Sequence, residues 1–214
     1  METVDLIQTL ARDTKPARRL RPLSVRLVVW AAVSLVIVSV WIVVFGVRPD
    51  LSPKLGELRF IVEGLLLLTG GIFSALISLV LGIPDNDRKL ALKVSALIPV
   101  TAWFTLLIVV LIHNFTHGEA NALSAGLGVN CVRDIFLIGM GPALFLFYLV
   151  RRASPTEPAL TGALVLISMT CIGALGTHFL CKNDRALHLI VWHFLPIIVL
   201  ALAGLSLGRR LLRW

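Results

Sequence analysis

The side chains of this sequence that are best suited to chemistry are cysteines and histidines at the ends of apolar runs. In the stretch GTHFLCKND, residues 176–184, His178 and Cys181 lie three positions apart where such a run gives way to charge. Cys131 closes the polar stretch that follows another run. Thiolate and imidazole groups bind zinc, copper and heavier thiophilic ions, and two thiols in an oxidising compartment normally pair. These residue types therefore indicate thiol chemistry.

Three interpretations of Cys131 and Cys181 remain open from the sequence. The two residues can form a structural disulfide, act as a redox-responsive or metal-responsive pair, or be unrelated. In the second interpretation His178 joins Cys181, because residues at i and i+3 share one face of a helix. A disulfide needs Cα atoms within about 7 Å, and spacing along the chain does not supply that distance.

The five histidines differ in depth along the apolar runs. His193 lies deepest, where polar groups usually face the interior of a helix bundle, so we expect it to contact something specific. His178 and His193 together also suit an alternative function, a membrane redox protein that binds haem or copper. For His113, His117 and His188 we expect the ordinary interfacial position of an amphipathic ring.

The composition places the chain in a membrane. Hydrophobic residues make up 57% of the 214 positions, charged residues make up 15%, and the mean hydropathy is +0.92. A bilayer core needs about 20 apolar residues per helix. Six runs lack Asp, Glu, Lys and Arg, at 27–47, 64–83, 94–112, 135–150, 159–181 and 186–208. The sequence therefore predicts an all-α, polytopic protein built as a six-transmembrane-helix bundle.

Details of the runs refine this expectation. The run at 135–150 is short, so its helix is expected to begin earlier and to carry Arg133 and Asp134 in the headgroup layer. Small residues recur in GGIFSALIS, GMGPA and CIGALG and permit close helix packing, and Cys171 among them is expected to pack as a small hydrophobe. Kinks are expected where prolines fall within or near a run, at Pro99, Pro142 and Pro196.

Basic residues are distributed unevenly between the two ends of the runs. Lys and Arg near the ends of spans are retained in the cytoplasm, and an even number of spans puts both termini on one side. Fourteen of the 20 Lys and Arg residues lie on the side of the termini, and six lie on the other. We therefore expect cytoplasmic termini, with Cys131, Cys181 and all the histidines toward the outer face. This bias and headgroup contact account for the net charge of +8, so no direct nucleic-acid binding is expected.

Several function classes are disfavoured. No C-x-x-C motif is present, which argues against a disulfide-exchange enzyme. Glu63 is the only acidic residue flanked by apolar sequence, which argues against a proton-coupled or ion-coupled transporter. No long soluble stretch is available for an enzymatic domain. We expect a protein that is not an enzyme, with no cofactor and no small-molecule substrate.

The first 26 residues carry a second pattern. Apolar residues recur at helical spacing over residues 4–11, with polar residues on the other faces, and Lys15 with Pro16 would end the helix. A helix of about three turns is not stable alone in water. Because Asp5 and Asp13 lie on its polar face, we expect it to bind a soluble protein partner in addition to contacting the lipid bilayer.

At this point the sequence resembles a known family, the NrsF-like integral-membrane anti-sigma factors of proteobacteria. The resemblance covers essentially the whole chain. It is carried by the LIxxLAxD stretch at Leu6 to Asp13, the PARRLRP run from Pro16 to Pro22, the six spans, and the cysteines at positions 131 and 181.

The resemblance implies an anti-sigma factor in the bacterial inner membrane. Residues 1–26 would hold an extracytoplasmic-function sigma factor away from RNA polymerase, residues 27–208 would form the sensor domain, and residues 209–214 a basic cytoplasmic tail. Cys131 and Cys181 would sense oxidative or thiophilic-metal stress, with transient metal binding at that pair, and His178 and His193 are the histidines expected to belong to the same sensing site. The expected partner-binding residues are Leu6, Ile7, Leu10, Ala11, Asp13, Pro16, Arg18, Arg19 and Leu20.

Overall fold

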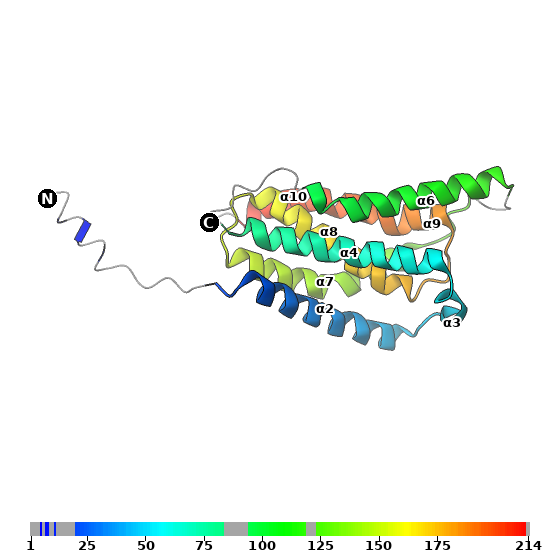
Figure 1. Ribbon diagram of the computed structural model, residues 1–214, viewed down its shortest axis with the longest axis horizontal. Coiled ribbons are helices and arrows are strands. Elements are labelled where there is room, and N and C mark those ends of the chain that lie inside the picture. Colours follow the sequence, from blue (N-terminus) through cyan, green and yellow to red (C-terminus); the bar gives the residue numbers. More distant parts are fainter. Residues whose placement is uncertain are drawn as a thin grey trace.

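The computed structural model describes residues 5, 7, 8, 11, 20–83, 94–118 and 123–212, and its regular elements are all helical. The elements are α2 (Leu23–Phe45), α3 (Leu51–Lys54), α4 (Leu58–Leu81), α6 (Ile98–Thr116), α7 (Val129–Arg151), α8 (Pro158–His178), α9 (Ala186–Leu189), the π turn η1 (Ile190–Phe194) and α10 (Leu195–Leu211) (Figure 1).

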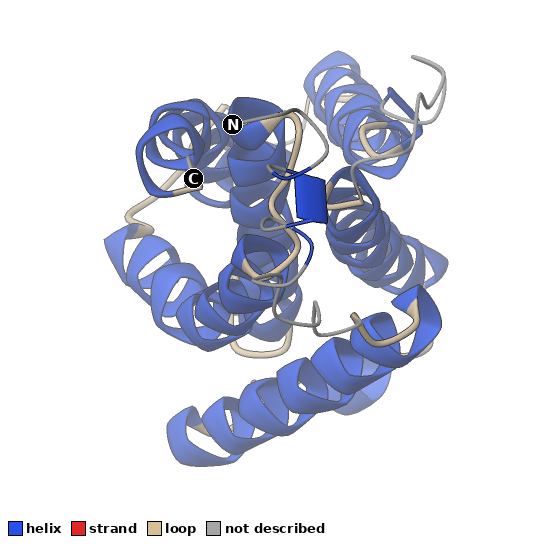
Figure 2. Cartoon of the chain, turned by 90° about the vertical axis from the view of Figure 1, so that its left-hand side faces the viewer, coloured by secondary structure: helices blue, strands red, loops and turns tan. Residues whose placement is uncertain are grey.

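Among the described residues, six helical segments are long and apolar enough to cross a membrane, and α9, η1 and α10 form the last one as a continuous segment. The prediction of an all-α, six-helix polytopic protein is therefore confirmed. The long helices run side by side, with the start of α2 and the end of α10 at one end of the bundle and α3 and α9 at the other (Figure 1). Figure 2 views the bundle from the end at which α2 begins and α10 ends and shows helices joined by loops.

Helix bounds differ from the apolar runs in ways that have local reasons. α7 begins at Val129, so Arg133 and Asp134 do lie in its first turns. α2 begins at Leu23, inside the expected head of residues 1–26, and α10 extends to Leu211, inside the expected tail. The kink expected at Pro99 is replaced by a helix start, because proline is tolerated in the first turn, where its missing N–H has no intrahelical partner.

α8 is the central helix of the bundle. It packs on α4, α7 and α10, and 78% of its most apolar window is buried inside the protein. Close approach depends on small residues, as the sequence predicts: a Cβ added at Gly173 would overlap the backbone of Ile135 in α7, and one at Gly162 would overlap Gly204 in α10. Cys171 is fully buried in this core and packs as expected.

The N-terminal segment is described only at four positions before residue 20. Asp5, Ile7, Gln8 and Ala11 are helical and exposed, with Ile7 60% exposed. Leu20 follows as an exposed residue just before α2. The other expected partner-binding residues lie outside the described residues: Leu6, Leu10, Asp13, Pro16, Arg18 and Arg19.

Candidate functional site

Cys131 and Cys181 lie together at the end of the bundle opposite the start of α2 and the end of α10. Cys131 is in the first turn of α7, and its N–H bonds to the carbonyl of Gly128. Cys181 follows the end of α8, and its N–H bonds to the carbonyl of Thr177. Both are free thiols, and their Sγ atoms are 3.5 Å apart. Two residues that are 50 positions apart thus share one site.

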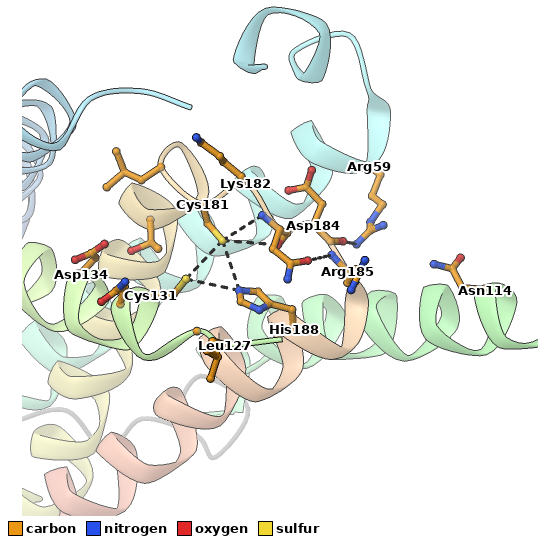
Figure 3. A pocket seen from close by; sticks show the side chains of 15 residues that line it. Arg59, Asn114, Leu127, Cys131, Asp134, Cys181, Lys182, Asp184, Arg185 and His188 are labelled. Carbon is orange, nitrogen blue, oxygen red and sulfur yellow. Dashed lines mark hydrogen bonds between the residues drawn. The ribbon is translucent and has the colours of Figure 1, made fainter. Parts of the chain in front are cut away.

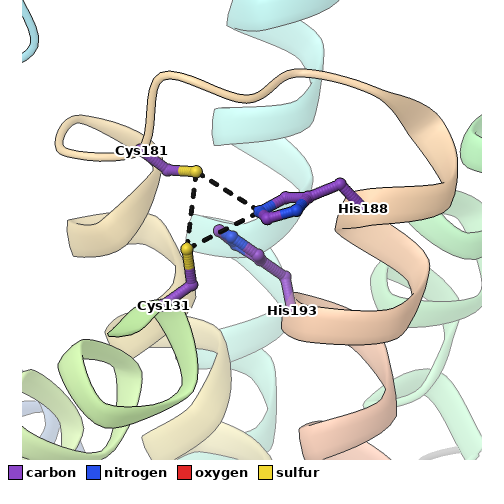
Figure 4. Close-up of side chains that lie close together, drawn as sticks. All are labelled: Cys131, Cys181, His188 and His193. Atoms are coloured by element: carbon purple, nitrogen blue, oxygen red, sulfur yellow. Dashed lines mark hydrogen bonds between the residues drawn. The ribbon is translucent and has the colours of Figure 1, made fainter. Parts of the chain in front are cut away.

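Two buried histidines complete the group (Figure 4). His188 Nε2 lies 3.6 Å from Cys131 Sγ and 3.5 Å from Cys181 Sγ. The ring of His193 also faces the sulfurs in Figure 4, and one ligand atom from each of the four residues lies within 4.8 Å of all the others. Each histidine is only 1% exposed. We refer to Cys131, Cys181, His188 and His193 as the sulfur–imidazole cluster.

A π turn helps to bring the two histidines together. Residues five apart on an α-helix point about 140° away from one another. In η1 the N–H of Leu195 bonds to the carbonyl of Ile190, and this wider turn carries His193 toward the side of His188. Pro196 supplies a local reason, because it has no N–H to donate to the carbonyl of Trp192, and its ring would clash with that carbonyl in a regular helix.

The loop before α7 orients His188. His188 Nδ1 lies 2.7 Å from the carbonyl oxygen of Ala125, so this nitrogen is the N–H donor and Nε2 faces the sulfurs. Trp192 Nε1 donates a hydrogen bond of 3.0 Å to the carbonyl of Gly126, where a φ of +61° suits glycine. The ring position of His188 is therefore fixed from outside the cluster.

The two sulfurs also line an open hollow of about 880 Å³ (Figure 3). Its wall carries both acidic and basic side chains, including Asp134, Asp184 and Lys182. Cys181 lies between helices, and the hydrogen bond from the Cys131 thiol holds the pKa of Cys181 below its ordinary value, with His188 adding to this effect and burial opposing it. Cys181 therefore ionises more readily than an isolated cysteine, and its side chain lines the hollow.

His178 does not belong to the cluster, contrary to its expected pairing with Cys181. α8 ends at His178, so the two residues do not share a helical face. Its Nε2 is 3.1 Å from the carbonyl of Phe60, and its ring stacks on Phe60 with centroids 4.0 Å apart. These contacts occupy Nε2 and one face of the His178 ring. His178 is therefore not placed to bind a haem together with His193.

Of the three histidines that were expected at the membrane interface, two are exposed and one is buried. His113 and His117 stack on each other at the end of α6 and are exposed, as expected of interfacial rings. His188 was expected to do the same but is buried beside both sulfurs. The missed signal is its position seven residues after Cys181, across a short loop that folds back.

An ion-pair cluster lies beside the loop that carries Cys181. Arg48 has a side chain only 1% exposed and contacts Asp50 at 2.7 Å and Asp184 at 2.6 Å. Lys54 contacts Asp184 at 3.0 Å, and Arg59 donates to the backbone carbonyl of Asp184 at 2.8 Å. The loop between α8 and α9 is thus held by charges from the connection between α2 and α4 and from the first turn of α4.

Comparison with known proteins identifies a family. A family model described as NrsF, negative regulator of sigma F, matches residues 10–214. Neither a curated protein nor a solved structure matches the chain. Because the match covers nearly the whole sequence, the chain belongs to the NrsF family, and a sigma factor is the partner that the family description implies.

Proposed function

As this chain is a member of the NrsF family, we propose that it holds an extracytoplasmic-function sigma factor at the bacterial inner membrane and releases it under stress. Residues 1–26 bind the sigma factor in the cytoplasm, and Cys131 with Cys181 senses an oxidant or a thiophilic metal ion in the periplasm. The observation that carries the proposal is the proximity of the two thiols, 3.5 Å apart, at the end of a membrane-length bundle opposite the start of α2.

The N-terminal segment supplies the binding surface. Ile7, which is helical and 60% exposed, is an apolar side chain available to a groove on a partner. We assign Leu6, Leu10 and Ala11 to the same apolar binding surface. The stretch from Asp13 through Pro16, Arg18 and Arg19 to Leu20 continues the contact toward the membrane.

The thiol pair supplies the switch. Hydrogen peroxide as a two-electron oxidant takes two electrons and two protons from Cys131 and Cys181, which form one S–S bond while peroxide becomes two waters. A metal ion instead displaces the thiol protons and bonds to both sulfurs. Shifting a two-state protein from 1:99 to 99:1 needs about 5.5 kcal/mol of differential binding, which either event can supply.

Co-purification of the sigma factor tests the proposal. The full-length protein is isolated from membranes of its own host, without stress, as wild type, Ile7→Asp and Gln8→Asp. Both positions are helical and exposed, and each substitution adds one negative charge, so Gln8→Asp is a matched control for Ile7→Asp. We expect Ile7→Asp to lose the sigma factor by about tenfold or more, as for an interface anchor, while Gln8→Asp retains it. Equal retention by both variants would contradict binding through this segment.

A further inference from the structure

We propose that Cys131, Cys181, His188 and His193 together form a four-coordinate site for a divalent thiophilic cation of the Zn²⁺ and Cd²⁺ class. As a statement about the natural signal this inference rests on the proposed function, but the site itself can be measured without the sigma factor. It adds two histidines to a switch that was assigned to thiols alone, and it selects a metal ion as the ligand.

The spacing of the donor atoms fits a tetrahedral ion. With Zn–S bonds of about 2.3 Å and Zn–N bonds of about 2.0–2.1 Å, a regular tetrahedron has S–S edges of about 3.8 Å and S–N edges of about 3.6 Å. The measured S–S separation is 3.5 Å, and the two separations from sulfur to His188 Nε2 are 3.5 and 3.6 Å. Three of the four donor atoms therefore already lie close to three corners of one such tetrahedron.

His193 supplies the independent observation that points to a ligand. Both of its ring nitrogens are buried and have no hydrogen-bond partner among the described residues. A buried polar group without a hydrogen-bond partner destabilises a fold, so the presence of His193 at this buried position needs an explanation. Since its ring faces the sulfurs (Figure 4) and lies within 4.8 Å of the other donors, a metal ion bound by one nitrogen accounts for it.

His188 is already oriented as metal-binding histidines usually are. Such residues donate the second ring N–H to a carbonyl or carboxylate, which fixes the ring and raises its basicity. His188 makes this contact with the carbonyl of Ala125 at 2.7 Å. Its Nε2 is thereby directed at the position between the two sulfurs.

Charge balance selects a divalent ion. Binding of M²⁺ releases one proton from Cys131 and one from Cys181, and two thiolates with two neutral imidazoles then hold the ion in a site of zero net charge. A monovalent ion in the same site would leave one negative charge among groups that are largely buried, which is costly. Sulfur and nitrogen donors without a carboxylate also exclude Mg²⁺ and Ca²⁺, which prefer oxygen.

A disulfide explains less of the arrangement. It would use Cys131 and Cys181 and leave His193 without a hydrogen-bonding role. A disulfide would also give no reason for His188 Nε2 to lie close to both sulfurs. The open hollow of about 880 Å³ lined by both cysteines provides a path by which an ion reaches the site.

The test is a metal titration of the purified, reduced full-length protein in detergent after treatment with a chelator. Cd²⁺ binding is followed by the sulfur-to-metal charge-transfer absorbance, and Zn²⁺ is added in competition. We expect one Cd²⁺ per chain and displacement by Zn²⁺. His193→Ala should weaken binding by at least about tenfold, since even changes to outer-shell groups have effects of this size. His113→Ala, at an exposed ring remote from the cluster, is the matched control and should bind like the wild type.

The outcomes separate the site from its role. Absence of Cd²⁺ binding in the wild type, or equal affinity in wild type and His193→Ala, overturns the four-ligand site even if peroxide still releases the sigma factor. Saturation of the site without sigma-factor release in membranes overturns its role as the signal while the site stands. A thermal melt of apo His193→Ala checks that the fold is kept. If it is not, His193→Gln, which keeps a polar side chain, replaces it in the same titration.

Discussion

Arg48 and Asp184 join the α2–α4 connection to the loop that carries Cys181. Their side chains meet through two contacts, Arg48 Nη1 to Asp184 Oδ1 at 2.6 Å and Arg48 Nη2 to Asp184 Oδ2 at 2.8 Å. The backbone N–H of Arg48 also donates to the carbonyl of Phe179 at 3.1 Å, just after α8. Direct contacts therefore link the cysteine loop to the segment that follows α2, and α2 itself begins just after the N-terminal segment.

This relationship predicts a variant that is uncoupled from the signal. Asp184→Asn removes the charge that the buried Arg48 guanidinium faces on the loop, and loss of a hydrogen bond to a charged group costs about 1.5–3 kcal/mol. We expect a lower unfolding temperature and weaker sigma-factor release on stress, with Cd²⁺ binding retained. Thermal melts and release assays measure this, and Glu57→Gln, at the exposed partner of Lys54, is the control. Unchanged release in Asp184→Asn would exclude this contact as a relay.

The same ion pairs predict loss of stability in acid. Hydrogen bonds from Arg48 lower the pKa of Asp50 to about 2, and bonds from Arg48 and Lys54 lower the pKa of Asp184 against the opposing effect of burial. Because both folded-state values lie below the unfolded value of about 3.9, the stabilisation is present above that pH and is lost as pH falls through the folded values. Melts from about pH 6 to about pH 2 should show a steeper decline for wild type than for Asp184→Asn. Parallel curves would contradict this.

The π turn predicts an effect of a proline outside the cluster. Pro196→Ala restores an N–H that can bond to the carbonyl of Trp192, so a regular α-helix can form and turn His193 away from His188. We expect Cd²⁺ affinity to fall by about tenfold with the bundle intact, by comparison with outer-shell changes. Pro99→Ala, in the first turn of α6, should leave affinity unchanged. Equal affinity of the two variants would show that the π turn does not position the ligand.

Removing both thiols separates sensing from folding. The double variant Cys131→Ser, Cys181→Ser should keep its fold and hold the sigma factor, because the packing of the bundle does not depend on a bond between these residues. Release by peroxide or Cd²⁺ should be lost. Cys171→Ser, in the core, tests whether an unrelated thiol matters. A double variant that is unstable or releases the sigma factor constitutively would instead favour a structural disulfide.

The proposed orientation predicts the result of reporter fusions. Alkaline phosphatase, which is active only after export, should be active when fused after Lys182 and inactive when fused at the C-terminus. A fluorescent protein at the C-terminus should be bright, since that end is expected in the cytoplasm by the distribution of Lys and Arg. Activity of both phosphatase fusions would place the thiols and the termini in one compartment and remove the basis of the proposed relay.

The sequence alone determined the six-helix membrane architecture. The length of each apolar run and the charges at its ends are local properties, and membrane insertion depends directly on them. The sequence also singled out Cys131 and Cys181 as a candidate thiol pair and His193 as the deep histidine, and the structure brings the three residues together. The N-terminal motifs, the six spans and the cysteines at positions 131 and 181 together suggested the NrsF family, which the family match confirms. Small residues such as Gly173 indicated where helices approach closely.

Only the tertiary structure decided which residues meet. His178 was expected beside Cys181, but α8 ends at His178 and its ring stacks on Phe60 instead. His188 was expected at the interface, but the loop of Ala125 and the return of the chain after Cys181 bury it against both sulfurs. The physical reason is that contacts between residues far apart in sequence depend on helix packing and on a local π turn, and neither leaves a periodic pattern in the chain.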